Sequence, residues 1–306
     1  MARLRLLVLG AGAGGGVPQW NCRCRVCELA WAGDGRVLHR TQSSVAVSLD
    51  GERWLLVNCA PEVLAQIKAN PQLHPRPQED GSGRHSPIAS TLLTNGDVDH
   101  VAGLLSLRES QPFTLYATEE IHGILRANRI FDVLADGIVQ RRSLELDAPL
   151  EPLPGLEVRV FPVPGKSALY METPDMEIGA VGQATVGVEF LSAAGSLYYI
   201  PGCARMSEEL AKRLQGAAAV LFDGTLWEDD EMITAGLGKK TGQRMGHLSI
   251  SGADGSMAAF STLDVGRKVF VHINNTNPVL IEGSEERRAV EAAGWEVAYD
   301  GMEISL

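Results

Sequence analysis

Short runs of Val, Leu and Ile alternate along the chain with longer segments in which apolar residues recur about every three or four positions. The short runs are typical of strands, and the longer period is typical of helices that bury one face. This pattern predicts strands at 3–9, 44–49, 53–58, 88–94, 114–117, 156–163, 185–192, 196–200, 218–223 and 268–272, and helices at 61–69, 98–106, 118–127, 207–214, 256–262 and 284–293.

The predicted elements fall into two strand-rich halves, at about 1–145 and 182–306, of one domain that spans residues 1–306. Strands and helices in this order fit an α/β fold in which two mixed sheets pack face to face under helices. The Pro- and Gly-rich segment 147–181 lies between the halves. We predict that it is a long connecting loop, suited to form the wall or lid of a pocket.

Composition narrows the range of partners. The 306 residues are 45% hydrophobic, which is enough for a large core. With 27 Lys and Arg against 38 Asp and Glu, the net charge of −11 disfavours nucleic acid as a partner. No apolar run approaches the roughly 20 residues that a membrane helix needs, and glycines follow the apolar start where a signal peptide would need a cleavage site. We therefore expect a cytoplasmic protein that acts on a small molecule.

Three of the five cysteines, Cys22, Cys24 and Cys27, lie close together in the sequence. An odd number of cysteines in a chain without a secretion signal argues against a disulfide framework. Three neighbouring thiolates can bind one tetrahedral Zn²⁺, so the cluster predicts a structural zinc site. Three reduced cysteines in a loop are the alternative. Cys59 and Cys203 lie in apolar surroundings and are expected to be buried thiols.

Residues 10–15 (GAGAGG) match the glycine pattern of dinucleotide-binding loops. That kind of site requires a helix directly after the glycines, because the N-terminus of the helix receives the pyrophosphate. Here the segment 16–20 (GVPQW) and the cysteine cluster follow. We therefore expect no nicotinamide or flavin site, and we assign the glycines to a tight turn beside the metal sites.

Acids and histidines gather near the ends of predicted strands: Asp99, His100, Asp223, His247 and His272. Each alone is more often structural. Buried groups of this kind are costly unless a metal or a hydrogen bond satisfies them, so together they predict a convergent site.

The segment 94–100 (TNGDVDH) resembles the loop that the metallo-β-lactamase superfamily writes as Thr-His-x-His-x-Asp-His. In that superfamily the first two histidines bind one metal and the Asp-His pair binds another. Here Asn95 and Asp97 stand in the positions of the first two histidines, whereas Asp99 and His100 keep the second pair. The resemblance implies one active-site metal, although Asp97 is a carboxylate that could rebuild part of the first site.

The resemblance extends over essentially the whole chain. The segments 18–24 (PQWNCRC), 40–44 (RTQSS), 97–109 (DVDHVAGLLSLRE), 223–225 (DGT), 245–247 (MGH) and 272–278 (HINNTNP) follow one another as in the coenzyme PQQ synthesis protein B family. This implies the αββα fold of the metallo-β-lactamases. It also implies similarity to two groups of dinuclear hydrolases, the phosphonate-pathway cyclic phosphodiesterase and the tRNA-end-processing ribonucleases.

Carried over residue by residue, the resemblance assigns the active-site metal to Asp99, His100, His272 and, at the position that bridges two metals in the hydrolases, Asp223. It makes His247 the counterpart of a proton donor, and His247 or Asp97 would then move protons.

Arg108 and Asn274 are candidates for contact with the substrate. In the phosphodiesterase a histidine closes the cysteine site, and Asn275 stands in its position here. Asn275 or a water is therefore left as the fourth zinc ligand.

Two histidines and a carboxylate with open positions are the arrangement with which non-haem Fe(II) enzymes bind O₂ and substrate. The resemblance implies PQQ biosynthesis through Fe(II)- and O₂-dependent hydroxylation of the tyrosine ring of a cross-linked Glu–Tyr precursor. A metal-dependent hydrolase and a non-catalytic carrier that assists transport of PQQ or its precursor are the alternatives. The expected partners are the peptide-derived precursor and O₂. Binding to other PQQ biosynthesis proteins and formation of a homodimer are left as alternatives.

Overall fold

The computed structural model describes residues 3–79, 81–173 and 177–306, and it contains two seven-stranded sheets. In spatial order, the first sheet consists of β14 (Glu303–Ser305), β1 (Arg5–Gly10), β2 (Ser44–Ser48), β3 (Trp54–Val57), β4 (Ile88–Leu92), β5 (Phe113–Ala117) and β6 (Val139–Ser143). The second consists of β13 (Trp295–Val297), β12 (Arg267–Val271), β11 (Ala219–Asp223), β10 (Gly195–Ile200), β9 (Val186–Ser192), β8 (Leu156–Pro162) and β7 (Pro149–Leu153). Both sheets are mixed, with parallel pairing from β3 to β6 and from β10 to β13.

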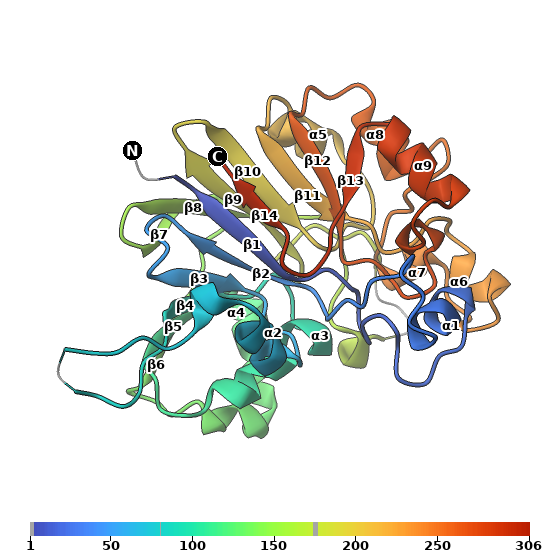
Figure 1. Cartoon of the computed structure of the whole chain (residues 1–306). Helices are drawn as coiled ribbons and strands as arrows, with labels where there is room; N and C mark the ends of the chain where they lie inside the picture. The colour runs from blue at the N-terminus through green and yellow to red at the C-terminus, as the bar shows by residue number, and fades with distance from the viewer. Residues whose placement is uncertain (1–2, 80, 174–176) are drawn as a thin grey trace.

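Helices cover the outer sides of both sheets (Figure 1). The α-helices are α1 (Arg25–Trp31), α2 (Val63–Ala69), α3 (Val98–Val101), α4 (Glu119–Ala127), α5 (Glu208–Leu214), α6 (Glu231–Thr234), α7 (Gly242–Met245), α8 (Ser256–Phe260) and α9 (Glu285–Ala292). The 3₁₀ helices are η1 (Pro71–Leu73), η2 (Ala102–Leu107), η3 (Arg129–Val133), η4 (Leu169–Met171) and η5 (Pro278–Leu280). None of the helices in the described ranges is long and apolar enough to cross a membrane.

Three apolar layers explain why inner strands such as β1 and β11 are apolar on both faces. Side chains alternate between the two faces of a strand, and here both faces are buried. On β1, Val8 packs between the sheets, whereas Leu7 packs under the helices of the first sheet. On β11, Leu221 packs between the sheets and Phe222 packs under the helices of the second. The predicted αββα architecture is confirmed.

Every predicted strand and helix is present, with boundaries shifted by a few residues, but the predicted halves do not coincide with the sheets. Within the segment 147–181, which was predicted to be a long connection, the predicted strand 156–163 is β8, and the structure adds β7, which was not predicted. The C-terminal β14 pairs with β1 in the first sheet. The predicted helix 98–106 divides into α3 and η2. The part of the segment 147–181 without strands therefore lies after β8, between β8 and β9.

Candidate metal centre

The ends of three strands bring the predicted site residues to one edge of the sandwich. Asp99 and His100 lie on α3, which follows β4 after a short loop. Asp223 is the last residue of β11, and His272 follows β12 directly. Because β11 and β12 are parallel neighbours, their carboxyl ends meet at the same edge. His247 comes from the turn after α7 and stacks on His272, with ring centroids 5.1 Å apart.

Asp99, His100 and His272 form a compact set of three ligands. Their ligand atoms lie within 4.8 Å of one another. Oδ2 of Asp99 is 3.2 Å from Nε2 of His272 and 3.7 Å from Nε2 of His100. Nε2 of His100 is buried and has no hydrogen-bond partner among the described residues. A buried nitrogen of this kind is costly unless something binds its lone pair, so these residues fit one metal ion with open positions.

Two neighbouring side chains turn both imidazoles toward Asp99. Nδ1 of His100 donates to Oδ1 of Asn95 at 2.7 Å, and Nδ1 of His272 donates to Oγ1 of Thr225 at 2.8 Å. A proton held on Nδ1 leaves the Nε2 lone pair for a metal. In the dinuclear hydrolases the residue at the position of Asn95 is itself a metal ligand. Here Asn95 instead positions the ligand His100.

The charges of the three ligands depend on one another. Burial lowers the pKa of His100, which favours the neutral imidazole. Burial also opposes the charged forms of Asp99 and His272, but their mutual attraction outweighs it. Against burial, His100 and then His272 lower the pKa of Asp99, and the hydrogen bond and charge of Asp99 raise the pKa of His272. A metal that binds here competes with a proton for Nε2 of His272.

The backbone at His272 has a φ of 56°, in the left-handed region that residues other than glycine rarely adopt. The carbonyl oxygen of His272 lies 2.9 Å from Oγ1 of Thr225, and N of Ile273 donates to O of Ala11 at 2.9 Å. Strained backbone of this kind is typical of functional sites that the surrounding structure holds in place.

Asp223 is saturated by four hydrogen bonds. Its Oδ1 accepts from N and Oγ1 of Thr225 at 3.0 and 2.6 Å. Its Oδ2 accepts from N of Cys203 at 2.8 Å and from Nδ1 of His247 at 2.7 Å. In this structure Asp223 orients Thr225 and His247, and its role as a metal ligand stays a prediction.

Asp97 and Asn274 also line the site, but Arg108 lies elsewhere. Oδ1 of Asp97 accepts a hydrogen bond from N of Leu169 at 2.8 Å. This bond attaches the segment after β8 to residues 94–100, which we call the metal loop. Asn274 follows His272 by two residues in the sequence and lines the pocket. Arg108 is exposed and donates to O of Leu105 at 3.0 Å, and the described residues that line the pocket do not include it.

The pocket over these ligands has a volume of about 260 Å³. Its wall includes the apolar side chains of Leu169, Met232 and Met245 and the charged side chains of Lys166 and Glu172. The segment 147–181 therefore contributes part of the wall, as the sequence predicted. Sequence analysis missed Lys166 and Glu172 as pocket residues, because charged residues in a connecting segment carry no pattern that separates them from ordinary surface residues.

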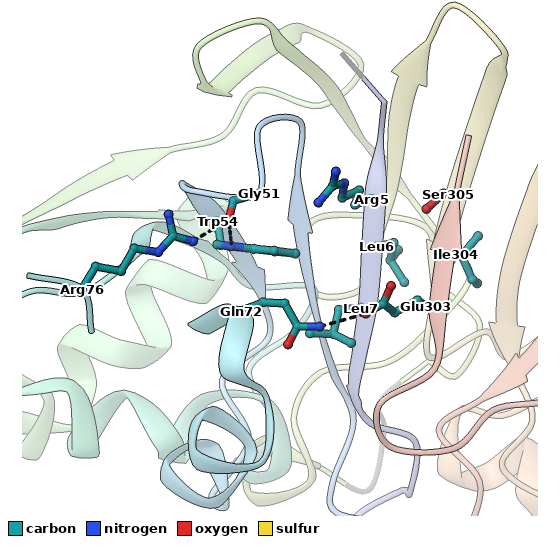
Figure 2. Close-up of a pocket in the computed structure, with 10 residues that line it drawn as sticks. All are labelled: Arg5, Leu6, Leu7, Gly51, Trp54, Gln72, Arg76, Glu303, Ile304 and Ser305. Atoms are coloured by element: carbon teal, nitrogen blue, oxygen red, sulfur yellow. Dashed lines mark hydrogen bonds between the residues drawn. The ribbon is translucent and has the colours of Figure 1, made fainter. Parts of the chain in front are cut away.

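A second cavity, of about 220 Å³, lies beside the pairing of β1 and β14 (Figure 2). Arg76 donates to O of Gly51 at 2.6 Å, and Gln72 donates to Glu303 at 2.8 Å. Its ten lining residues include no histidine, cysteine or aspartate. This cavity offers no metal site.

The three clustered cysteines and Asn275 form a second metal-binding arrangement. The sulfur atoms of Cys22, Cys24 and Cys27 lie within 4.8 Å of one another. Nδ2 of Asn275 lies 3.2 Å from the sulfurs of Cys22 and Cys27 and 3.7 Å from that of Cys24. Oδ1 of Asn275 is buried and finds no hydrogen-bond partner in the described part of the chain.

Exchanging the oxygen and nitrogen of the Asn275 amide would direct the oxygen at the cysteine sulfurs. Asn275 is thus the side chain that faces the open side of the cluster. Burial and the neighbouring cysteines raise the pKa of Cys24 to about 12. A bound cation would offset this cost by stabilising the thiolates, so the residues fit zinc. Cys59 and Cys203 are buried, as predicted, and burial raises the pKa of both thiols.

Comparison with known proteins identifies the family. A family model for the beta-lactamase superfamily domain matches residues 53–273. "Coenzyme PQQ synthesis protein B" of Methylorubrum extorquens (strain PA1) is 59% identical over 303 residues, a match that covers 99% of this chain and 100% of the relative. The chain belongs to the coenzyme PQQ synthesis protein B family. The family member of Rhodopseudomonas palustris (strain BisB5) is 53% identical over 312 residues. The resemblance stated from the sequence is confirmed.

A solved structure of the same family supports the fold. The crystal structure of Zn(2+)-bound PqqB from Methylobacterium extorquens matches with a TM-score of 0.96 and 59% identity, covering 99% of this chain and 100% of that one. A diphosphatase from the PhnP family matches with a TM-score of 0.69 at 21% identity, covering 99% of this chain and 97% of that one. The second similarity shows a shared fold alone.

We predict that Cys27→Ser removes about one zinc ion per chain, because a tetrahedral site of three thiolates and one weaker ligand does not tolerate the loss of a thiolate. Metal analysis of purified protein, with thermal unfolding in parallel, measures the effect. Cys59→Ala is the matched control, since Cys59 is buried outside the cluster. Equal zinc content in Cys27→Ser and the control would contradict the assignment.

Asn95→Ala should weaken metal binding at the Asp99 site by about 10- to 100-fold, the usual effect of losing a group that orients a histidine ligand. The ring of His100 would lose the acceptor that fixes its Nδ1 proton. Titration of the metal-depleted site with Co(II), followed by absorbance, gives the affinity. An unchanged affinity would mean that Asn95 does not position His100.

Glu231 gives a pH prediction for stability. Burial raises its pKa to about 7, although N of Trp227 donates to its Oε2 at 2.6 Å and Thr276 donates to its Oε1. Since the folded protein prefers the protonated acid, its contribution to stability is fully present below pH 4.5 and is lost as the pH rises through about 7.

Glu231→Gln should remove this dependence. The free energy of unfolding of the variant, relative to the wild type, should rise by roughly 3 kcal/mol between pH 4.5 and pH 8. Urea unfolding at both pH values measures it. Parallel pH profiles for the two proteins would show that Glu231 does not titrate in this range.

Proposed function

We propose that this protein acts in PQQ biosynthesis as a non-haem Fe(II) enzyme that uses O₂ to hydroxylate the tyrosine ring of a cross-linked Glu–Tyr precursor. The observation that carries the proposal is the set of Asp99, His100 and His272, in which a buried histidine nitrogen lacks a partner among the described residues. Two histidines and one carboxylate with open positions suit O₂ chemistry at iron. The family name of the relatives supports the pathway.

The hydrogen bonds of the metal loop support a single metal at the reacting centre. Oδ1 of Asn95 accepts from Nδ1 of His100 and from N of Asp97, at 2.7 and 3.0 Å. Oδ1 of Asp97 accepts from N of Leu169. A metal bound by these two side chains would have to replace contacts that hold the loop together. Hydrolysis by the dinuclear mechanism requires that second metal, whereas O₂ chemistry does not.

Fe(II) held by Asp99, His100 and His272 would supply the activation of O₂. The chain's own residues would orient the substrate and move protons. Nδ1 of His247 donates to Asp223, which leaves Nε2 as the nitrogen free to accept a proton from the ring and return it. Asp97 is the second group in the pocket able to take a proton. Leu169, Met232 and Met245 give the aromatic ring an apolar wall and exclude water from it.

A metal-dependent hydrolase is the second candidate. Asp223, His247 and His272 form another set whose ligand atoms lie within 4.8 Å of one another. If this set bound a second ion, the centre would become dinuclear, and such centres activate water. Two ions per chain in addition to the cysteine zinc would favour this function.

The proposed function predicts oxygen uptake that depends on substrate. The protein is loaded with Fe(II) without air, the cross-linked diamino acid and ascorbate are added, and O₂ is admitted. One oxygen atom should appear in the ring by mass spectrometry, while the other leaves as water with electrons from ascorbate. His272→Ala should lose iron binding and turnover, and His74→Ala, an exposed histidine outside the pocket, should keep both.

Absence of substrate-dependent uptake and of hydroxylated product in iron-loaded wild type would overturn the oxygenase function. Ester or phosphodiester cleavage by the zinc-loaded protein would instead favour the hydrolase. Tight binding of PQQ without oxygen consumption would favour the carrier.

A further inference from the structure

Three cations surround one carboxylate in the wall of the metal pocket. Nζ of Lys166 lies 3.1 Å from Oε1 of Glu172, and Nζ of Lys240 lies 2.5 Å from Oε2. Nη1 of Arg244 lies 3.8 Å from the same Oε2. Lys166 and Glu172 line the pocket itself. We call Lys166, Glu172, Lys240 and Arg244 the cationic cluster.

The cationic cluster holds more positive charge than its own acid neutralises. This is unusual in a chain whose net charge is −11. The side chains of Lys166 and Glu172 are only 9% and 11% exposed, so solvent screens them little. Nη1 of Arg244 is buried and donates to no acceptor within residues 3–79, 81–173 and 177–306. The side chains of Lys240 and Arg244 are 38% exposed, so an anion in the pocket can reach both, and it would satisfy the buried Nη1 of Arg244.

The two other acids of the pocket do not supply that anion. Asp99 pairs with His272 across 3.2 Å and belongs to the metal ligands. Asp97 accepts from N of Leu169. Among the ion pairs of the described residues, Glu172 is the one carboxylate that contacts the cations of the cluster.

The fold places the cationic cluster directly beside His247. The stem of Lys166 runs along Gly246, the residue before His247. A Cβ at position 246 would lie 3.1 Å from Cγ of Lys166, and Gly246 has a φ of 90°. Glycine thus allows both the left-handed turn and the close approach of the lysine. Arg244 lies on α7, which ends at this turn. A group bound by the cluster would therefore lie close to the proposed proton-transfer residue.

We propose that the cationic cluster is the binding site for a carboxylate of the substrate, which makes the pocket selective for aromatic molecules that carry carboxylates. The substrate carboxylate binds the three cations that Glu172 also contacts, Lys166, Lys240 and Arg244, and so supplies the second anion. The apolar wall of Leu169, Met232 and Met245 then contacts the ring. The identity of the substrate rests on the proposed function, but binding of an aromatic carboxylate does not require turnover.

The test measures binding rather than catalysis. PQQ, which carries three carboxylates, and its trimethyl ester are titrated into the zinc-loaded full-length protein, and the dissociation constants are compared. Lys240→Gln should weaken binding of PQQ by about tenfold, as expected for the loss of one charge-assisted contact, and Lys240→Arg should restore most of it. Binding of the trimethyl ester should be unchanged by either variant.

Glu172→Gln provides a test of opposite sign. Removing the competing carboxylate should strengthen binding of PQQ severalfold, whereas a merely structural cluster would lose affinity in this variant as well. Lys239→Gln removes the same charge from an exposed neighbour and should leave binding within about twofold.

Weaker binding of PQQ by Glu172→Gln would overturn the proposal, as would equal binding of PQQ by the wild type and Lys240→Gln. These outcomes are independent of the oxygen-uptake test. A protein that binds PQQ through the cluster but consumes no oxygen would keep the carboxylate site and lose only the oxygenase function.

Discussion

Two buried imidazoles face one carboxylate where the two sheets meet. His272 comes from the second sheet, whereas Asp99 and His100 follow β4 of the first. No local segment could hold these three groups together. Burying them costs free energy, and only the packing of both sheets offsets that cost. The apolar layer between the sheets therefore sets the geometry of the metal centre. Asn95 and Thr225 then refine it by fixing which nitrogen of each histidine faces Asp99.

The sequence predicted the interior of the fold better than its margins. The four strands that it missed, β6, β7, β13 and β14, are the four edges of the two sheets. Edge strands are short or carry charged residues and proline, which prevents unwanted pairing but also removes the apolar pattern. Two prolines in β7 and two arginines in β6 illustrate this.

The convergence of acids and histidines was predictable where these residues end or follow buried strands, as Asp223 and His272 do. The groups that organise them were not, because Thr225, Asn95 and Lys166 act through contacts that depend on how distant segments pack. Arg108 shows the converse error. It follows a helix next to the metal ligands in the sequence, yet its side chain turns back onto O of Leu105 and stays outside the pocket. Proximity in sequence is a poor guide once a helix changes from α to 3₁₀ geometry, as it does at η2.

One short turn carries both His272 and Asn275, so only two residues of chain, Ile273 and Asn274, separate the candidate metal centre from the cysteine cluster. Oδ1 of Asn275 and Nε2 of His272 therefore cannot be placed independently. If an ion in one site stabilises the conformation of this turn, it also increases the affinity of the other site for its ion. By thermodynamic linkage, the coupling free energy is the same in both directions. An ion held by the three cysteines would in this sense be coupled to an ion held by Asp99, His100 and His272, as well as bracing the fold.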